Sequence, residues 1–277
     1  MIRSGTRLNA WWRVIVVCAI ANLSVAAEPL FFAFDNGVGG TPAQQATMLK
    51  ELGYAGIGYT GTNQLAERQR AFADAGLVIT SLYVACKLGS PPTCDAGLLE
   101  ALPLLKDRGI ALWLTVHGQG DDDAAAAAVR LVAEPAAKFG VAVVLYPHHG
   151  FRVATAEQAL PIVEKVALPN VGLTINLCHE LRAGNGPRLP QIIRATAKHL
   201  RLVSINGAEP VGENWSTLIK PLGEGTFDVL NVLRELHAVG YAGPVGLQCF
   251  AVPGDQRTNL QRSLAAWRQY RAALAKP

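Results

Sequence analysis

Polar and aromatic residues recur at one kind of position in this sequence, directly after short apolar runs. The clearest case is the run Val171–Ile175, which is followed by Asn176, Cys178 and His179. The other runs lead to Asp35 with Asn36, Tyr59, Tyr83, His117, Tyr146 with His148, Asn206, and Gln248. Histidine titrates near neutral pH, and side-chain amides both donate and accept hydrogen bonds. This set of residues therefore suits acid–base chemistry on a ligand rich in hydroxyl groups, such as a small polyol or a sugar.

The apolar runs alternate with helical patterns along the whole chain. We expect strands at 30–34, 55–59, 77–83, 110–116, 141–145, 171–175, 200–205 and 245–247. We expect the helices to lie at 42–52, 65–75, 96–107, 121–139, 155–165, 189–199, 228–239 and 259–274. Continuous apolar strands are typical of parallel sheets that are buried on both faces. Eight strand–helix units predict a closed (β/α)8 TIM barrel, and the Gly-rich first turn of a doubly wound sheet is missing.

In a (β/α)8 barrel the active site lies at the carboxyl ends of the strands. We therefore expect the polar residues named above to face one pocket. We interpret His179 and His148 as the leading acid–base residues, with Tyr146 as proton donor or orienting group and His117 as a further catalytic candidate. The expected sugar-binding residues are Asn176, Asn206, Gln248, Asp35, Tyr59 and Tyr83.

The first 27 residues have the layout of a secretory signal peptide. Arg3, Arg7 and Arg13 precede an apolar run, and the small residues Ala26 and Ala27 follow it. The alternative is a buried or membrane-anchoring helix, although the run is short for a bilayer span. We expect cleavage before Glu28, an exported protein without a stable membrane span, and one barrel domain over residues 28–277.

Charge and cysteine content limit the partners and the redox chemistry. The full chain has a net charge of +4. Residues 1–27 hold three arginines and no acidic residue, so the remainder has 22 basic against 21 acidic side chains. No basic patch with aromatic residues indicates nucleic-acid binding. Cys86 and Cys94 flank a turn-rich loop and could form a disulfide or stay as free thiols. Their spacing alone does not decide between these two states.

Four short motifs give the chain a resemblance to the xylose isomerase-like TIM barrels. They are Leu52–Ile57 (LGYAGI), Pro169–Thr174 (PNVGLT), Leu222–Gly225 (LGEG) and Gly240–Pro244 (GYAGP). The superfamily contains sugar and sugar-phosphate isomerases and epimerases as well as apurinic endonucleases. The resemblance covers the chain after the signal peptide, and it implies a sugar isomerase or epimerase.

The resemblance also implies a divalent metal, held by a glutamate ending strand five, an aspartate ending strand six, a histidine ending strand seven and a glutamate ending strand eight. In this sequence those positions are Tyr146, Asn176, Ser204 and Gln248, and none of them is acidic. Neutral side chains cannot supply the charge that holds such a cation. A family-type metal site is therefore not expected. The histidines that match the family, His117, His148 and His179, could instead bind zinc if their rings converge.

Two functions follow from these observations. The first is an exported enzyme that removes a proton next to a carbonyl of an unphosphorylated sugar or keto-glycoside, as an isomerase, an epimerase or an eliminating lyase. The second is a sugar-binding barrel without catalysis. The replaced acidic positions favour the second function, and the histidines favour the first.

Overall fold

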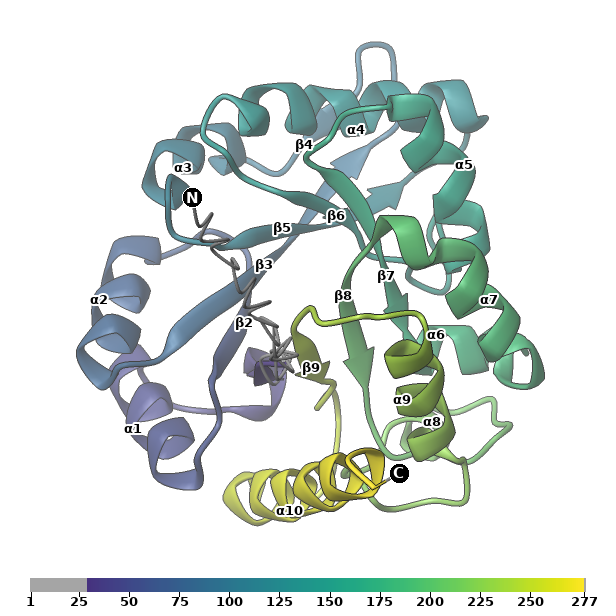
Figure 1. The fold of residues 1–277 in the computed structure, drawn as a ribbon. Helices are drawn as coiled ribbons and strands as arrows, with labels where there is room; N and C mark the ends of the chain where they lie inside the picture. Colours follow the sequence, from purple (N-terminus) through teal and green to yellow (C-terminus); the bar gives the residue numbers. More distant parts are fainter. Residues whose placement is uncertain (1–28, 277) are drawn as a thin grey trace, which may run out of the picture.

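Eight parallel strands form the centre of the protein, and their pairing closes a barrel (Figure 1). The computed structural model describes residues 29–276. The strands are β1 (Phe31–Phe34), β2 (Gly56–Thr60), β3 (Val78–Lys87), β5 (Ala111–His117), β6 (Val143–Leu145), β7 (Val171–Asn176), β8 (Leu200–Ile205) and β9 (Val245–Leu247). Their order is β2-β1-β9-β8-β7-β6-β5-β3, and β2 also pairs with β3, which closes the ring. The predicted (β/α)8 barrel is confirmed.

Helices surround the barrel and connect consecutive strands (Figure 1). They are α1 (Pro42–Leu52), α2 (Leu65–Ala75), α3 (Leu98–Leu105), α4 (Asp122–Ala137), α5 (Ala156–Val166), α7 (Leu189–Thr196), α9 (Val229–Ala238) and α10 (Gln256–Leu274). Two further short helices, α6 (Leu177–Arg182) and α8 (Trp215–Leu218), lie in the loops after β7 and β8.

Local sequence signals set the ends of several helices. Thr41 caps α1 through a capping box with Gln44, and Gly53 ends the same helix with a positive φ of 95°. Asp255 accepts a hydrogen bond from the backbone N–H of Thr258, so α10 begins at Gln256, three residues before the expected start. The predicted bounds of α1 and α2 are both confirmed.

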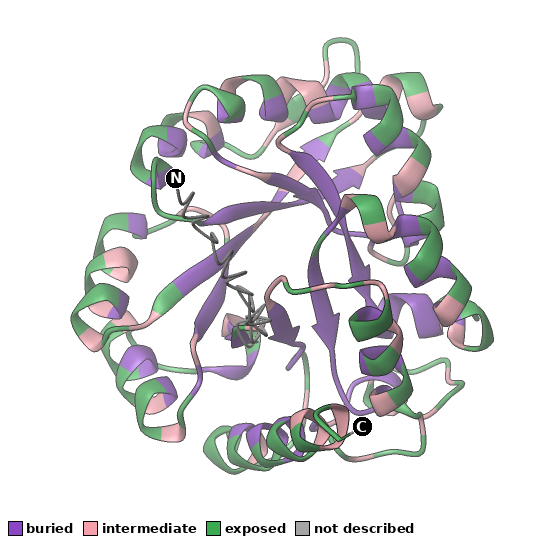
Figure 2. Ribbon diagram, viewed as in Figure 1, coloured by how far each residue is buried: buried purple, intermediate pink, exposed green. Residues whose placement is uncertain are grey.

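Apolar side chains form two layers, one between strands and helices and one inside the barrel. Most strand residues are buried, and the helices bury mainly the side that faces the strands (Figure 2). The interior cluster consists of Phe32, Phe34, Ala111, Trp113, Val144, Tyr146 and Leu202. Gly58 and Gly246 make room for these rings, because a Cβ atom at either position would lie within 3.0 Å of a phenylalanine ring. The interior of the barrel is therefore filled by packed side chains.

The structure differs from the expected elements in two places near the barrel rim. Strand β3 runs to Lys87 and turns back as a hairpin with β4 (Thr93–Cys94), which places Cys86 directly opposite Cys94. Both thiols are free. His179, expected at a strand tip, lies in the short helix α6, because the chain turns into a helix directly after Asn176.

The predicted signal peptide at residues 1–27 lies outside the described residues. Among residues 29–276, no helix combines the length and the apolar character that a bilayer span requires.

Candidate functional site

A cavity of about 380 Å³ opens at the carboxyl ends of the strands. It is lined by Phe34, Asp35, Asn36, Gly58, Tyr59, Thr60, Ser81, Tyr83, Trp113, Tyr146, His148, His179, Trp215, Ile219, Gln248 and Phe250. Seven of the ten predicted site residues are therefore brought together here. The ionisable groups of this lining are one carboxylate, two imidazoles and three phenols, and no lysine or arginine is among them. The cavity thus suits an uncharged ligand.

Aromatic rings form the floor of this cavity. Trp113 packs edge-on against Phe34 and Tyr146, with ring centroids 4.9 and 4.8 Å apart. Tyr83 packs edge-on against Tyr146 at 5.2 Å. Burial raises the pKa of Tyr83 to about 12 and that of Tyr146 well above its usual value. The floor therefore stays neutral at physiological pH and offers apolar ring surface to a ligand.

Gln248 lies at the centre of a hydrogen-bond network at the ends of β9 and β6. Its Oε1 atom accepts hydrogen bonds from Asn36 Nδ2 (3.0 Å) and from the backbone N–H groups of Cys249 (2.9 Å) and Phe250 (3.0 Å). Its Nε2 atom donates to the hydroxyl oxygen of Tyr146 at 3.2 Å. The orientation of the amide is therefore fixed, and its oxygen is occupied by three donors.

Asn176 and Ser204 form a similar pair at the ends of β7 and β8. Ser204 Oγ donates to Asn176 Oδ1 at 2.6 Å, and Asn176 Nδ2 donates to the carbonyl oxygen of Pro147 at 3.2 Å. Both side chains are fully buried, and neither residue lines the cavity. Asn176 therefore lies behind the wall and holds the backbone after β6.

His148 and His179 face each other at the cavity wall, with ring centroids 4.1 Å apart. The backbone N–H of His149 donates to His179 Nδ1 at 3.1 Å, which leaves the proton of a neutral His179 ring on Nε2. The Nδ1 atom of His148 lies 2.8 Å from the carbonyl oxygen of His149, which assigns the proton of that ring to Nδ1. One ring thus has a free N–H donor, and the other has a free nitrogen lone pair.

Burial keeps both imidazoles neutral. Desolvation lowers the pKa of His148 from 6.5, and it lowers the pKa of His179 well below 6.5. The neighbouring histidines lower both values further, because like charges disfavour a second protonation. The donor and acceptor roles assigned above therefore hold at neutral pH.

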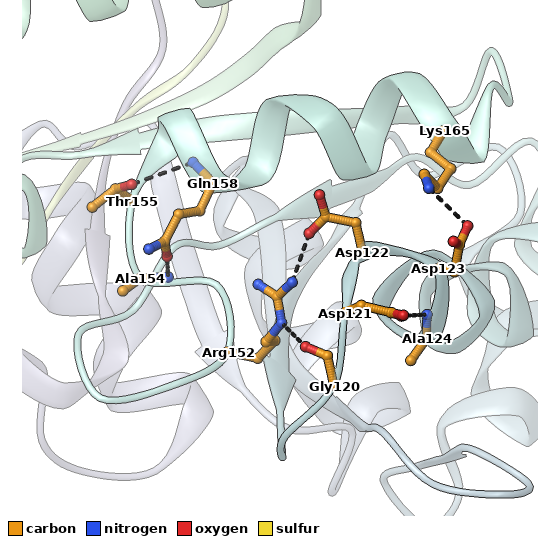
Figure 3. Close-up of polar contacts among 10 residues, drawn as sticks. All are labelled: Gly120, Asp121, Asp122, Asp123, Ala124, Arg152, Ala154, Thr155, Gln158 and Lys165. Carbon is orange, nitrogen blue, oxygen red and sulfur yellow. Dashed lines mark hydrogen bonds and ion pairs between the residues drawn. The ribbon is translucent and has the colours of Figure 1, made fainter.

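The loop that carries His148 is anchored to the start of α4 by Arg152 (Figure 3). The Nε atom of Arg152 donates to the carbonyl oxygen of Gly120 at 2.6 Å, and its Nη2 atom pairs with Asp122 at 2.6 Å. Two residues further on, the N–H of Ala154 donates to Gln158 Oε1 at 2.8 Å. These contacts hold the part of the loop that leads into α5, and such support is what a catalytic side chain needs.

The helix that carries His179 is fixed by the buried carboxylate of Glu180. Its two oxygens accept hydrogen bonds from the N–H of Ala156 and from Asn185 Nδ2, each at 2.7 Å. Burial raises the pKa of Glu180 despite these two bonds. Trp215 of α8 packs edge-on against His179, with 5.1 Å between ring centroids. The imidazole is thereby positioned from both sides.

Besides Asn176, two more predicted site residues lie outside the cavity lining. The rings of His117 and Phe151 have centroids 3.8 Å apart, and His117 lines a separate cavity. Phe151 also packs against His148 and separates it from His117. Asn206 is fully buried and donates to the carbonyl oxygens of Gly207 and Leu218, so it holds the loop before α8. The predicted placement of both residues at the pocket was wrong.

Two other predicted ligand-binding residues are already bonded to the protein. The hydroxyl of Tyr59 donates to Gln45 of α1 at 2.6 Å, so the side chain points away from the barrel axis. The carboxylate of Asp35 accepts hydrogen bonds from the N–H and the hydroxyl of Thr60, at 2.8 and 2.9 Å. Tyr59 and Asp35 line the rim of the cavity, and their roles toward a ligand stay predictions.

The three candidate zinc ligands do not form one centre. His148 and His179 are adjacent, but Phe151 lies between His148 and His117. Across residues 29–276, no group of three His, Cys, Asp or Glu side chains is arranged to hold a metal ion. The residues present therefore do not fit a histidine-bound zinc.

Eight lining residues were missed from the sequence, and three of them show why. Trp113 lies inside an apolar strand, and nothing in a continuous apolar run indicates which residues face the barrel interior. Ser81 lies in the middle of β3 and not at its end. Trp215 lies in a long loop without periodicity, and only its size and aromatic character could have singled it out.

Structural comparison identifies several barrels with the same fold. A xylose isomerase-like TIM barrel/4-hydroxyphenylpyruvate dioxygenase fusion protein matches with a TM-score of 0.72 and 18% identity, over 90% of this chain and 43% of the longer chain. A 3-keto-D-glucoside 4-epimerase from E. coli matches with a TM-score of 0.70 and 17% identity, over 87% of this chain and all of the other. A D-allulose 3-epimerase from Methylomonas sp. has a TM-score of 0.70 and 16% identity, over 88% and 97% of the two chains. At these identities the similarity establishes the fold alone.

A comparison with curated protein sequences found no match. The sequence model of the xylose isomerase-like TIM barrel family matches residues 46–270, which is most of the chain. The match begins in α1 and ends in α10, so it includes every cavity-lining residue except Phe34, Asp35 and Asn36. The chain therefore belongs to the xylose isomerase-like TIM barrel family.

Proposed function

We propose that the protein removes a proton next to a carbonyl group of an uncharged sugar or keto-glycoside, with His148 as the base. The observation that carries this proposal is the His148–His179 pair with complementary hydrogen-bonding states at the cavity wall. A neutral imidazole with a free nitrogen is a general base at neutral pH. In this role His148 Nε2 takes the proton from the carbon, and the electron pair of the C–H bond moves toward the carbonyl oxygen.

His179 stabilises the enediolate that forms in this step. Its Nε2–H group is the free donor of the pair, so it can hydrogen-bond the oxygen that gains negative charge. A neutral imidazole suits this task, because its proton is shared with the oxygen while the site stays uncharged. The low pKa of His179 keeps it in the neutral form.

The fate of the enediolate decides the type of reaction. A proton returned to the same carbon from the opposite side gives an epimer, and one returned to the neighbouring carbon gives an isomer. Loss of a glycosidic oxygen from the next carbon gives an elimination. A 3-keto-D-glucoside 4-epimerase and a D-allulose 3-epimerase share this fold. We favour a keto-sugar as substrate, because its carbonyl acidifies the neighbouring C–H group.

We further propose that this chemistry runs without the divalent metal that the family resemblance implies. The oxygen of Gln248 already accepts three N–H donors, and the oxygen of Asn176 accepts the hydroxyl of Ser204. A cation needs oxygen lone pairs and negative charge, and these amides offer neither toward the cavity. Tyr146, the remaining position, is kept as a neutral phenol by burial.

Incubation with ketoses, aldoses and 3-keto-glycosides tests the proposed reaction, with products followed by NMR. We expect conversion of at least one keto-sugar, at the same rate with a chelator and with added Mg²⁺ or Mn²⁺. No conversion of any of them under either condition would contradict the proposal.

A second candidate function is sugar binding without turnover. The fully bonded amides at the replaced acidic positions favour it, since they stabilise the site without adding a reactive group. Calorimetric titration separates the two functions, because saturable heat without product formation indicates a binding protein. Export from the cytoplasm remains part of the proposal for either function, and detection of the protein in the extracellular or periplasmic fraction tests it.

A further inference from the structure

Ser81 presents a buried hydroxyl to the cavity without using it in the fold. It lies on β3 two residues before Tyr83, so both side chains point to the same face of the strand. The residue is fully buried and lines the cavity. Among the described residues, no atom forms a hydrogen bond with its Oγ atom.

This hydroxyl is an exception among the buried hydroxyl side chains of the barrel. Ser204 Oγ donates to Asn176 at 2.6 Å, Thr80 Oγ1 donates to the carbonyl oxygen of Ile57 at 3.0 Å, and Thr115 Oγ1 donates to that of Val84 at 3.1 Å. A buried polar group without a partner lowers the stability of a fold. The hydroxyl of Ser81 forms no hydrogen bond within the folded protein, so its presence is explained best by a hydrogen bond to a bound ligand.

The surroundings of Ser81 place its buried hydroxyl next to the cavity. Gly58 of β2 is its partner in the strand register. A Cβ atom at Gly58 would lie 2.8 Å from Ser81 Oγ and 3.0 Å from the ring of Phe32. Any larger residue would therefore crowd the hydroxyl. Glycine leaves the Oγ atom beside an aromatic ring, with open cavity next to both residues.

We propose that Ser81 Oγ binds one oxygen atom of the ligand at the floor of the cavity and thereby sets its specificity. This inference rests on the proposed function for the class of ligand, an uncharged sugar. A serine hydroxyl both donates and accepts, so it can bond either a hydroxyl or a carbonyl oxygen. A site built around such a bond discriminates strongly against an analogue that lacks the oxygen. Ser81 is a positioning residue, since it takes no proton in the reaction.

The test compares Ser81→Ala with Ser204→Ala, a matched control in which a buried barrel serine does donate a hydrogen bond. Thermal unfolding without ligand is measured for both variants. We expect Ser204→Ala to lower Tm by about 2–4 °C, and Ser81→Ala to leave Tm unchanged or raise it by about 2 °C. A fall of Tm in Ser81→Ala equal to that in Ser204→Ala would show that the fold uses the hydroxyl, and it would overturn the inference.

Calorimetric titration with a methyl 3-keto-glucoside and its monodeoxy analogues tests the ligand contact. We expect wild type to bind one analogue about tenfold more weakly than the parent sugar, and Ser81→Ala to bind both equally. Unchanged discrimination in Ser81→Ala would overturn the Ser81 contact alone and leave the proposed function intact. A wild-type protein that binds and converts no sugar would overturn both.

Discussion

Replacing His148 by alanine removes the proposed base, and the structure sets the expected size of the effect. Loss of a general base reduces the rate by about 10²–10⁴-fold, or about 3–5 kcal/mol in activation free energy. His148 stacks on Phe151, with ring centroids 4.1 Å apart, and it is one of many residues that line the cavity. We therefore expect kcat to fall by that factor while sugar affinity changes by less than about tenfold.

The effects of replacing His148 and His179 should not be additive. His179→Ala removes the donor to the enediolate oxygen and should lower the rate by about 10²–10³-fold. Since both groups act in the same step, the double variant should be about as slow as the slower single variant. His237→Ala is the matched control, because this histidine lies exposed at the end of α9, outside the cavity lining.

The assay follows deuterium uptake from D₂O into the carbon next to the carbonyl of a 3-keto-glucoside by NMR. Folding of each variant is verified by circular dichroism and thermal unfolding. A folded His148→Ala protein that keeps more than about a tenth of the wild-type exchange rate would refute the assignment of His148 as the base.

Three further predictions concern stability and redox state. The folded state keeps His179 neutral because its pKa is lowered, so only the unfolded state gains a proton on this residue as the pH falls below 6.5. Relative to His179→Gln, wild type should therefore lose up to about 1.4 kcal/mol of unfolding free energy per pH unit between pH 6.5 and 5. Urea titrations at several pH values measure this loss. A difference that is independent of pH would contradict this. Gln248→Leu leaves three N–H donors without an acceptor and should lower the unfolding free energy by about 2 kcal/mol or more. Gln248→Glu keeps an acceptor oxygen, so its unfolding free energy should fall by less. An equal fall in both variants would disprove the role of the amide oxygen. Cys86 and Cys94 face each other as a non-hydrogen-bonded pair of the β3–β4 hairpin, and the Cα spacing of about 4.5 Å in such pairs suits a disulfide. Oxidised glutathione should therefore form this disulfide. Its formation should lower the intact mass of wild type by about 2 Da, and the mass of Cys94→Ser should not fall by this amount.

The fold was predictable because its signals are local. The capping residue Thr41 and the terminal Gly53 mark the ends of α1 in the sequence, and the continuous apolar run at 141–145 indicates a strand buried on both faces. Eight such units leave few arrangements other than a closed barrel. The hairpin of β3 and β4 escaped prediction, because β4 has only two residues.

The site was predictable only as a set of strand ends. Tyr59 and Tyr83 both follow apolar runs, yet their side chains point in different directions. The hydroxyl of Tyr59 donates a hydrogen bond to Gln45 of α1, whereas the ring of Tyr83 faces the barrel interior. The register of β2 against β3 shifts between Ile57 and Gly58, so the in-and-out alternation of side chains does not match along the two strands. A sequence pattern of period two does not reveal this shift. The separation of His117 from His148 depends on Phe151, a loop residue whose position is set by tertiary packing.

The central claim is that an uncharged histidine pair removes a proton next to a carbonyl without a divalent metal. Deuterium exchange by metal-stripped wild-type protein in the presence of a chelator, with His148→Ala as the reference, tests it most directly. We predict that one carbon-bound proton of the 3-keto-glucoside exchanges at least 100-fold faster with wild type than with the variant, and that Mg²⁺ or Mn²⁺ leaves this rate unchanged. Exchange that appears only after metal is added, or that equals the rate of His148→Ala, would contradict the claim.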